Sequence, residues 1–244
     1  MHLIQHAGAT HVGRVRKNNE DVFAIYPDVG IALVADGMGG AACGEVASQM
    51  TARAVWDFAD QSRQGLEAAE LLGGAIRFAN DRVWQAAQLP NGCDGMGTTI
   101  VMAHWRGDRL WLANVGDSRG YILRDGSLFQ LSYDQNLANE LRNSLGLTEE
   151  QIATYPQKNA LTMAIGTRAE VQPRICEGVL LEGDTILLCS DGLSNPVRES
   201  EIKDLLASGG PLPAIVESLV AAALAGGGPD NITVVLLRCA VTAD

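Results

Sequence analysis

The sequence lacks the residue patterns that mark several common classes of protein. It contains neither an HExxH nor a CxxC pattern, so zinc is not the expected metal. Its 29 acidic residues outnumber its 18 lysines and arginines, and the net charge of -11 argues against binding to nucleic acids or anionic membranes. The most apolar helical stretch, 215–224, is broken by Glu217 and Ser218 and is too short to span a bilayer.

Cysteine is scarce and shows no paired spacing. An odd number of cysteines, five, without a CxxC pattern predicts reduced thiols in a cytoplasmic protein. The start of the chain has no basic segment followed by an apolar run, so no signal peptide is expected. Cys189 and Cys239 lie in apolar runs and are predicted to be small core residues.

The 244 residues show no internal repeat and no linker, which favours one α+β domain over residues 1–244. Apolar runs predict strands at 3–10, 22–26, 30–35, 185–189 and 232–239. Periodic segments predict helices at 45–59, 66–88, 135–144, 199–207 and 213–225, and a capping box at Thr148 predicts another short helix. Four further strands, at 98–105, 109–115, 120–124 and 128–131, are joined by short turns and predict an antiparallel meander.

Three aspartates, Asp36, Asp191 and Asp230, each border one of these apolar strands. A single Asp-Gly after a strand is usually only a turn. If the three strand ends converge, however, the carboxylates share one site, and unpaired buried carboxylates require a cation. Oxygen ligands suit hard ions such as Mn²⁺ or Mg²⁺.

The order of the short motifs is more specific than any one of them. They occupy residues 13–21, 36–40, 95–99, 114–119, 190–193 and 230–233. In this order they resemble the motifs of the PPM (PP2C-type) metal-dependent serine/threonine protein phosphatases, in particular the compact bacterial type. The resemblance covers nearly the whole chain and implies a central β-sandwich of two antiparallel sheets flanked by pairs of α-helices.

The resemblance also implies a set of metal ligands. Asp36 would bridge two Mn²⁺ or Mg²⁺ ions, and the carbonyl oxygen of Gly37 would bind one of them. Asp191 and Asp230 would complete the site of the other ion. Asp117, together with Asp191, would hold a third ion.

Around these ligands, the resemblance implies that Glu20 and Asp21 hold metal-bound waters in place. Arg16 would bind the substrate phosphate with its planar set of donors. A hydroxide shared by two ions would attack phosphorus directly, without a phosphoenzyme intermediate. The implied substrates are phosphoserine and phosphothreonine in proteins, and the implied partner of this monomeric enzyme is a cognate serine/threonine kinase.

Two features of the motifs leave parts of the reaction open. Met38 occupies the position at which animal members carry a histidine proposed as general acid, so the group that protonates the leaving oxygen is not identified. Residues 132–166 correspond to the flap beside the site of bacterial members, where substrate choice is expected to be set. The flap is similar to that of relatives that work beside secretion-system kinases.

Two other functions remain as alternatives. A non-catalytic module that binds phosphoproteins could share the fold, but such a protein should have lost a metal ligand. A hydrolase of small phosphate esters could use the same residues, because an open acidic site accepts simple esters as well as proteins.

Overall fold

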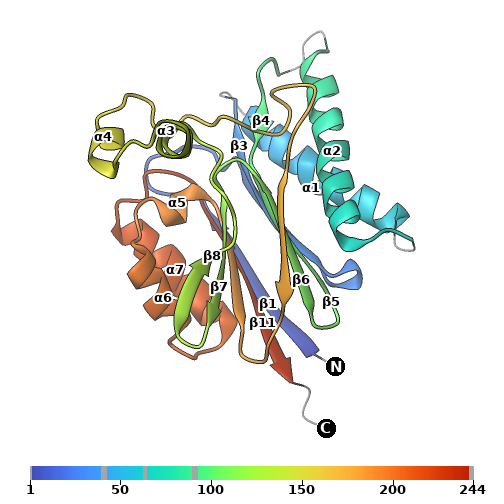
Figure 1. Ribbon diagram of the computed structural model, residues 1–244, viewed down its shortest axis with the longest axis vertical. Coiled ribbons are helices and arrows are strands. Elements are labelled where there is room, and N and C mark those ends of the chain that lie inside the picture. Colours follow the sequence, from blue (N-terminus) through green and yellow to red (C-terminus); the bar gives the residue numbers. More distant parts are fainter. Residues whose placement is uncertain (1, 40–42, 63–64, 90–92, 242–244) are drawn as a thin grey trace.

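Two antiparallel sheets stack face to face, with helices on both outer sides (Figure 1). The computed structural model describes residues 2–39, 43–62, 65–89 and 93–241. Sheet I has the strand order β1-β11-β10-β7-β8. Its bounds are β1 His2–His11, β11 Ile232–Val241, β10 Thr185–Cys189, β7 Arg119–Arg124 and β8 Ser127–Gln130.

Sheet II has the strand order β2-β3-β5-β6-β9, and the short β4 pairs with β3. Its bounds are β2 Asp21–Tyr26, β3 Ile31–Met38, β4 Gly97–Thr98, β5 Ile100–Arg106, β6 Arg109–Val115 and β9 Arg174–Val179. A 3-10 turn, η1 (Pro27–Val29), joins β2 to β3. The predicted β-sandwich is therefore confirmed.

Each sheet carries helices on its outer face (Figure 1). Sheet II is covered by α1 (Cys43–Gln61) and α2 (Ala68–Ala87). Sheet I is covered by α5 (Asp191–Ser194), α6 (Glu199–Leu206) and α7 (Leu212–Ala225). The helices α3 (Leu137–Leu145) and α4 (Glu149–Ala153) stand over one end of the sandwich, and the predicted capping box at Thr148 is present. None of the described helices is long and apolar enough to cross a membrane.

The alternation of side chains along the central strands explains the layers. In β3, Ile31 and Leu33 pack toward α1 and α2, while Ala32 and Val34 pack into the space between the sheets. Both faces of this strand are fully buried, which is why its sequence is a continuous apolar run. The predicted burial of Cys189 and Cys239 is also confirmed.

The predicted meander is wrong at its centre. β5 pairs with β6 in sheet II, whereas β7 pairs with β8 in sheet I. The chain crosses between the sheets at 116–118, where Gly116 adopts a φ of +95° that other residues rarely adopt. A short link usually joins antiparallel neighbours in one sheet, but the link at 116–118 leads the chain from β6 in sheet II to β7 in sheet I. Asp117 therefore lies at the junction of the two sheets.

The edge strand β9, which pairs with β6, is not predicted by the sequence pattern. Most of its residues are exposed, so the strand lacks the apolar alternation that marks a half-buried strand.

The predicted reduced state is wrong for two of the five cysteines. Cys43, the first residue of α1, forms a disulfide with Cys93, which is 50 positions further along the chain. The α1–α2 hairpin brings both residues to the same end of sheet II, and no local spacing in the sequence announces such a contact. Cys176, Cys189 and Cys239 are free thiols.

A buried ion pair lies at the far end of the sandwich from α3. Asp184 is only 2% exposed and accepts hydrogen bonds from the Arg124 guanidinium at 2.9 and 2.6 Å. The same carboxylate accepts a bond from the backbone N–H of Leu181 at 2.7 Å. Arg124 also donates to the carbonyl of Val179, so the pair connects sheet I to the last residue of β9 in sheet II.

Replacing Arg124 with leucine should lower the free energy of unfolding by about 3 kcal/mol, because it leaves the buried Asp184 carboxylate without its cation. This value is at the low end for a broken buried pair, since Arg124 is partly solvated. Arg53→Leu is the matched control: its ion pair with Asp57 is exposed and should change stability by less than about 1 kcal/mol. Denaturant unfolding measures both variants, and equal losses would contradict the importance of the buried pair.

Candidate functional site

The predicted acids meet at one end of the sandwich, beside the flap. A pocket of about 400 Å³ opens there. It is lined by most of the residues predicted from the sequence: Arg16, Glu20, Asp36, Gly37, Asp117, Asp191 and Asp230. Asp21 lies behind this wall and is 5% exposed. The three strand-end aspartates thus share one pocket although up to 194 positions separate them (36 to 230).

The positions of these acids follow from the strands that carry them. Asp36 lies near the end of β3, directly opposite Asp21 of β2 in the antiparallel register. Asp191 begins α5 immediately after β10. Asp230 immediately precedes Asn231 and β11, and Asp117 lies in the turn between the two sheets. Both sheets therefore contribute acids to the pocket.

Crowding of like charges dominates the electrostatics of the pocket. Burial raises the pKa of Asp36 well above its usual range, and the charges of Asp21, Asp191, Asp230 and Asp117 raise it further. Burial likewise raises the pKa of Asp191, with Asp230 as the largest charged contributor. The folded chain thus opposes full ionisation of these groups.

Asp117 and Asp21 show the same effect. Burial raises the pKa of Asp117 to about 7, and the charges of Asp191 and Asp134 add to the shift. Burial raises the pKa of Asp21 to about 6, although hydrogen bonds from Thr233 and Ser190 act in the opposite direction.

Asp21 is held only on one side. Its Oδ2 accepts a hydrogen bond of 2.7 Å from the Ser190 hydroxyl. Its buried Oδ1 has no hydrogen-bond partner among the described residues. A buried carboxylate oxygen without a donor is costly, so this oxygen is suited to a water molecule or a cation that the pocket holds.

Arg16 is the one arginine among the described residues that line this pocket. Its Nη2 donates to Asp230 Oδ2 at 2.7 Å, and both side chains are partly exposed. The hydrogen bond that Arg16 donates to Asp230 and the charge of that carboxylate raise the pKa of Arg16. The predicted phosphate-binding residue therefore contacts a predicted metal ligand, and its role toward phosphate stays a prediction.

Asn231 holds the backbone around the pocket in place. This role was not predicted from the sequence. Its side-chain amide donates to the carbonyls of Val12 and Asn18, both at 2.9 Å. Its Oδ1 accepts the backbone N–H of Glu20 at 2.8 Å. One side chain thus fixes the loop that carries Arg16. The signal was its place next to Asp230, but the contacts span more than 200 positions and cannot be read from spacing.

Two threonines hold Asp36 by its backbone, and they too were not assigned from the sequence. The Thr98 hydroxyl donates to the Asp36 carbonyl at 2.9 Å. The Asp36 N–H donates to the Thr99 hydroxyl at 3.1 Å. Thr99 in turn shares a hydrogen bond of 2.7 Å with Ser118, beside Asp117. Neutral groups therefore fix the acids without cancelling their charge.

The donor set fits hard divalent cations. Side chains of four aspartates and one glutamate line the pocket, and the unpartnered Oδ1 of Asp21 is buried behind them. In the described part of the chain, no three His, Cys, Asp or Glu side chains are already arranged as an ion site. The acids instead line the pocket as separate groups whose mutual repulsion a cation would relieve.

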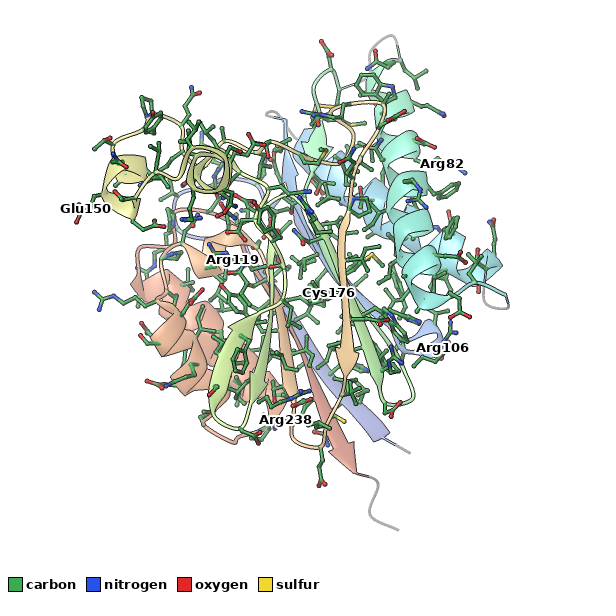
Figure 2. All side chains as sticks on the ribbon, viewed as in Figure 1. Arg82, Arg106, Arg119, Glu150, Cys176 and Arg238 are labelled. Carbon is green, nitrogen blue, oxygen red and sulfur yellow. A yellow bond between two sulfur atoms is a disulfide. The ribbon has the colours of Figure 1, made fainter. Side chains whose placement is uncertain are left out.

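A second, smaller pocket of about 290 Å³ adjoins the first, and Asp117, Asn159 and Asp191 line both. On its wall, the Arg119 guanidinium donates to Asp134 at 2.9 and 2.7 Å. Figure 2 places Arg119 on the α5 side, below α3, whereas Arg106 and Arg238 lie toward the other end of the sandwich.

Within the flap, the segment 158–160 is hydrogen-bonded to the first turn of α3. The N–H of Leu137 donates to the carbonyl of Ala160 at 2.9 Å, and that of Ala138 donates to Lys158 at 2.8 Å. These two bonds bracket Asn159, which lines both pockets. No hydrogen bond of the Asn159 side chain is seen among the described residues, so its amide is available to a ligand.

The raised pKa values of the acids predict an unusual pH dependence of stability. An acid whose pKa rises on folding makes its full contribution to stability below its unfolded pKa, which is near 4. This contribution is lost as the pH rises through the folded pKa. For Asp21 and Asp117, the folded values are about 6 and about 7. The free energy of unfolding in EDTA should therefore fall between about pH 4 and pH 7.

Denaturant unfolding at pH 5, 6, 7 and 8 measures this dependence. Asp117→Asn should flatten the curve between pH 5 and 7, and adding Mn²⁺ at pH 8 should restore stability. Stability that rises over the same interval in EDTA, with no effect of the substitution, would contradict the assignment of crowded acids.

Comparison with known proteins identifies relatives along nearly the whole chain. The family model for protein phosphatase 2C matches residues 7–222. The serine/threonine protein phosphatase PstP of Mycobacterium tuberculosis is 38% identical over 237 residues. That match covers 96% of this chain but only 45% of PstP, so the chain spans about half the length of this relative. The serine/threonine phosphatase stp of Listeria welshimeri is also 38% identical, and 94% of this chain and 93% of that protein are covered.

Solved structures that superpose on this chain include bacterial phosphatases of the same kind. The catalytic domain of PstP in complex with two manganese ions superposes with a TM-score of 0.88 at 34% identity, covering 99% of this chain and 100% of that one. PppA, a regulatory component of the type VI secretion system in Pseudomonas aeruginosa, gives a TM-score of 0.82 at 34% identity, with 97% of each chain covered. Because the family model spans most of the sequence and full-length relatives exceed 30% identity, the chain belongs to the protein phosphatase 2C family.

Proposed function

We propose that this protein is a metal-dependent phosphatase that hydrolyses phosphoserine and phosphothreonine in proteins. The observation that carries the proposal is the convergence of Asp36, Asp117, Asp191 and Asp230 on one pocket with Arg16 at its side. Relatives named as serine/threonine phosphatases support the substrate class. The manganese-bound PstP domain supports Mn²⁺ as a natural ion, with Mg²⁺ as the alternative.

Within this proposal, each acid has a defined part. Asp36 and the Gly37 carbonyl, with Asp191 and Asp230, would hold two ions, and Asp117 would contribute to a third. When bound, the ions would act as Lewis acids that ionise the attacking water and neutralise the phosphoryl oxygens. Glu20 and Asp21 would orient water around them.

The chain's own residues then perform the positioning. Arg16 presents a planar set of N–H donors at the pocket, which matches two phosphate oxygens once its contact with Asp230 is exchanged for the substrate. Asn231 limits how far this loop can move, because it bonds the loop backbone before and after Arg16. Met38, which lines the pocket, cannot transfer a proton, so another group must protonate the leaving oxygen.

The biological setting completes the proposal. We place the protein in the cytoplasm as a monomer that opposes a serine/threonine kinase. The similarity to PppA favours a kinase that acts with a secretion system, since PppA is described as a regulatory component of one.

Asp36→Asn or Asp191→Asn should lower kcat for a phosphothreonine peptide in Mn²⁺ by about 100-fold or more, because Lewis-acid stabilisation is worth several kcal/mol. Asp28→Asn is the control, since Asp28 is an exposed acid at the opposite end of the same β2–β3 hairpin. Steady-state kinetics with and without EDTA measure both. Unchanged rates in both pocket variants would remove the metal assignment.

Asn159→Ala should separate peptide binding from chemistry. Asn159 joins the main pocket to the second one, where residues flanking the phosphorylated residue would lie. KM for a phosphothreonine peptide should rise about 5- to 10-fold, the loss of about one hydrogen bond. KM for p-nitrophenyl phosphate, which has no flanking residues, should stay the same. Equal changes for both substrates would exclude a role in recognising the peptide.

A further inference from the structure

The Cys43–Cys93 disulfide lies beside the end of β3, which carries the predicted metal ligands Asp36 and Gly37. Both cysteines are partly exposed, and their Cα atoms are 5.5 Å apart. The disulfide joins the first residue of α1 to the loop before β4. These two segments contact the end of β3 and Gly39 from two sides, so the bond closes a covalent link across the end of this strand.

On the α1 side, the contact is backbone against backbone. A Cβ atom built on Gly37 would lie 2.2 Å from the carbonyl oxygen of Gly44, the residue after Cys43. A Cβ atom on Gly44 would lie 2.4 Å from Glu20 Oε2. Since neither position has room for a side chain, a shift of the start of α1 moves directly against Gly37 and Glu20. In the same helix, the Ser48 hydroxyl donates to the Glu20 carbonyl at 2.6 Å.

On the other side, the segment from Cys93 to Thr98 packs against the same end of β3. The Met96 N–H donates to the Cys93 carbonyl at 3.0 Å. A Cβ atom on Gly39 would lie 3.0 Å from the Met96 Cα and 3.3 Å from the Cys43 Cβ. β4 then pairs Gly97 and Thr98 with Met38 and Gly37.

We infer that Cys43 and Cys93 form a thiol–disulfide exchange site whose oxidation state sets the ion affinity of the pocket, an inference that rests on the proposed ion-dependent function. In the oxidised form, the disulfide holds the start of α1 and the segment from Cys93 to Thr98 at a fixed separation on either side of the end of β3. The reduced form removes this covalent link, so Gly37 and Glu20 are less well positioned before ions bind. Loss of such support around metal ligands typically lowers metal affinity 10- to 100-fold.

The exchange reaction needs a partner of the dithiol class. One thiolate of the dithiol attacks a sulfur of the Cys43–Cys93 bond and forms a mixed disulfide, and the other cysteine leaves as a thiolate. The second thiol of the partner then resolves the mixed disulfide. Two electrons and two protons pass to Cys43 and Cys93, and the partner becomes a disulfide; oxidation is the reverse reaction.

The free cysteines do not compete for this role. Cys189 and Cys239 are buried in the core. Cys176 is only partly exposed, and burial raises the pKa of its thiol, which lowers its reactivity. Cys176 therefore provides the control position.

The test measures Mn²⁺ binding by titration calorimetry on the whole chain in two states. The protein is oxidised, or reduced with dithiothreitol that is then removed by gel filtration under nitrogen, and thiol titration confirms each state. Reduction should raise the Kd for Mn²⁺ about 10-fold and increase amide exchange at Gly37 and Gly39, and reoxidation should reverse both. The double variant Cys43→Ser, Cys93→Ser should resemble the reduced wild-type protein after either treatment. Cys176→Ser should show the same change in Kd on reduction as the wild-type protein.

The outcomes separate this inference from the proposed function. Equal Kd values in both states of the wild-type protein, with phosphopeptide hydrolysis intact, would overturn the exchange site alone. No Mn²⁺ binding in either state would overturn both. Because wild-type protein carries the central comparison, the inference stays falsifiable even if the serine variant does not fold.

Discussion

The repulsion between carboxylates at one end of the sandwich is the constraint on which the rest of the site depends. Burial and mutual charge raise the pKa of Asp36, Asp117 and Asp191, so folding brings together groups that oppose one another. The scaffold must therefore supply this free energy from elsewhere. It does so with three apolar layers, two under the helices and one between the sheets.

The groups that hold the acids are mostly neutral. Thr98 and Thr99 fix the backbone of Asp36, and Asn231 fixes the loop that carries Arg16. Hydroxyl and amide groups restrain position without neutralising charge, so the pocket keeps its attraction for cations. Arg16 is the exception, because its guanidinium forms an ion pair with the Asp230 carboxylate.

Much of the fold could be predicted from the sequence where burial is two-sided or alternating, as in 31–35 and 232–239, because apolar patterns report burial directly. The shared pocket could be inferred because acids border these strands. The crossover at Gly116 could not, since a short turn specifies a reversal but not the layer that the chain enters. The disulfide and the contacts of Asn231 join positions 50 to more than 200 residues apart, and β9 has too little burial to leave a pattern.

The pairing of β1 with β11 has a consequence for the molecule as a module. His2 lies opposite Val241 in the register, at the end of sheet I that is remote from the acidic pocket (Figure 1). Polypeptide joined to His2 or Val241 would thus emerge on the side remote from the acidic pocket. A circularly permuted version, with a short bridge between these two residues and a new opening in a surface loop, would preserve the architecture around the acids.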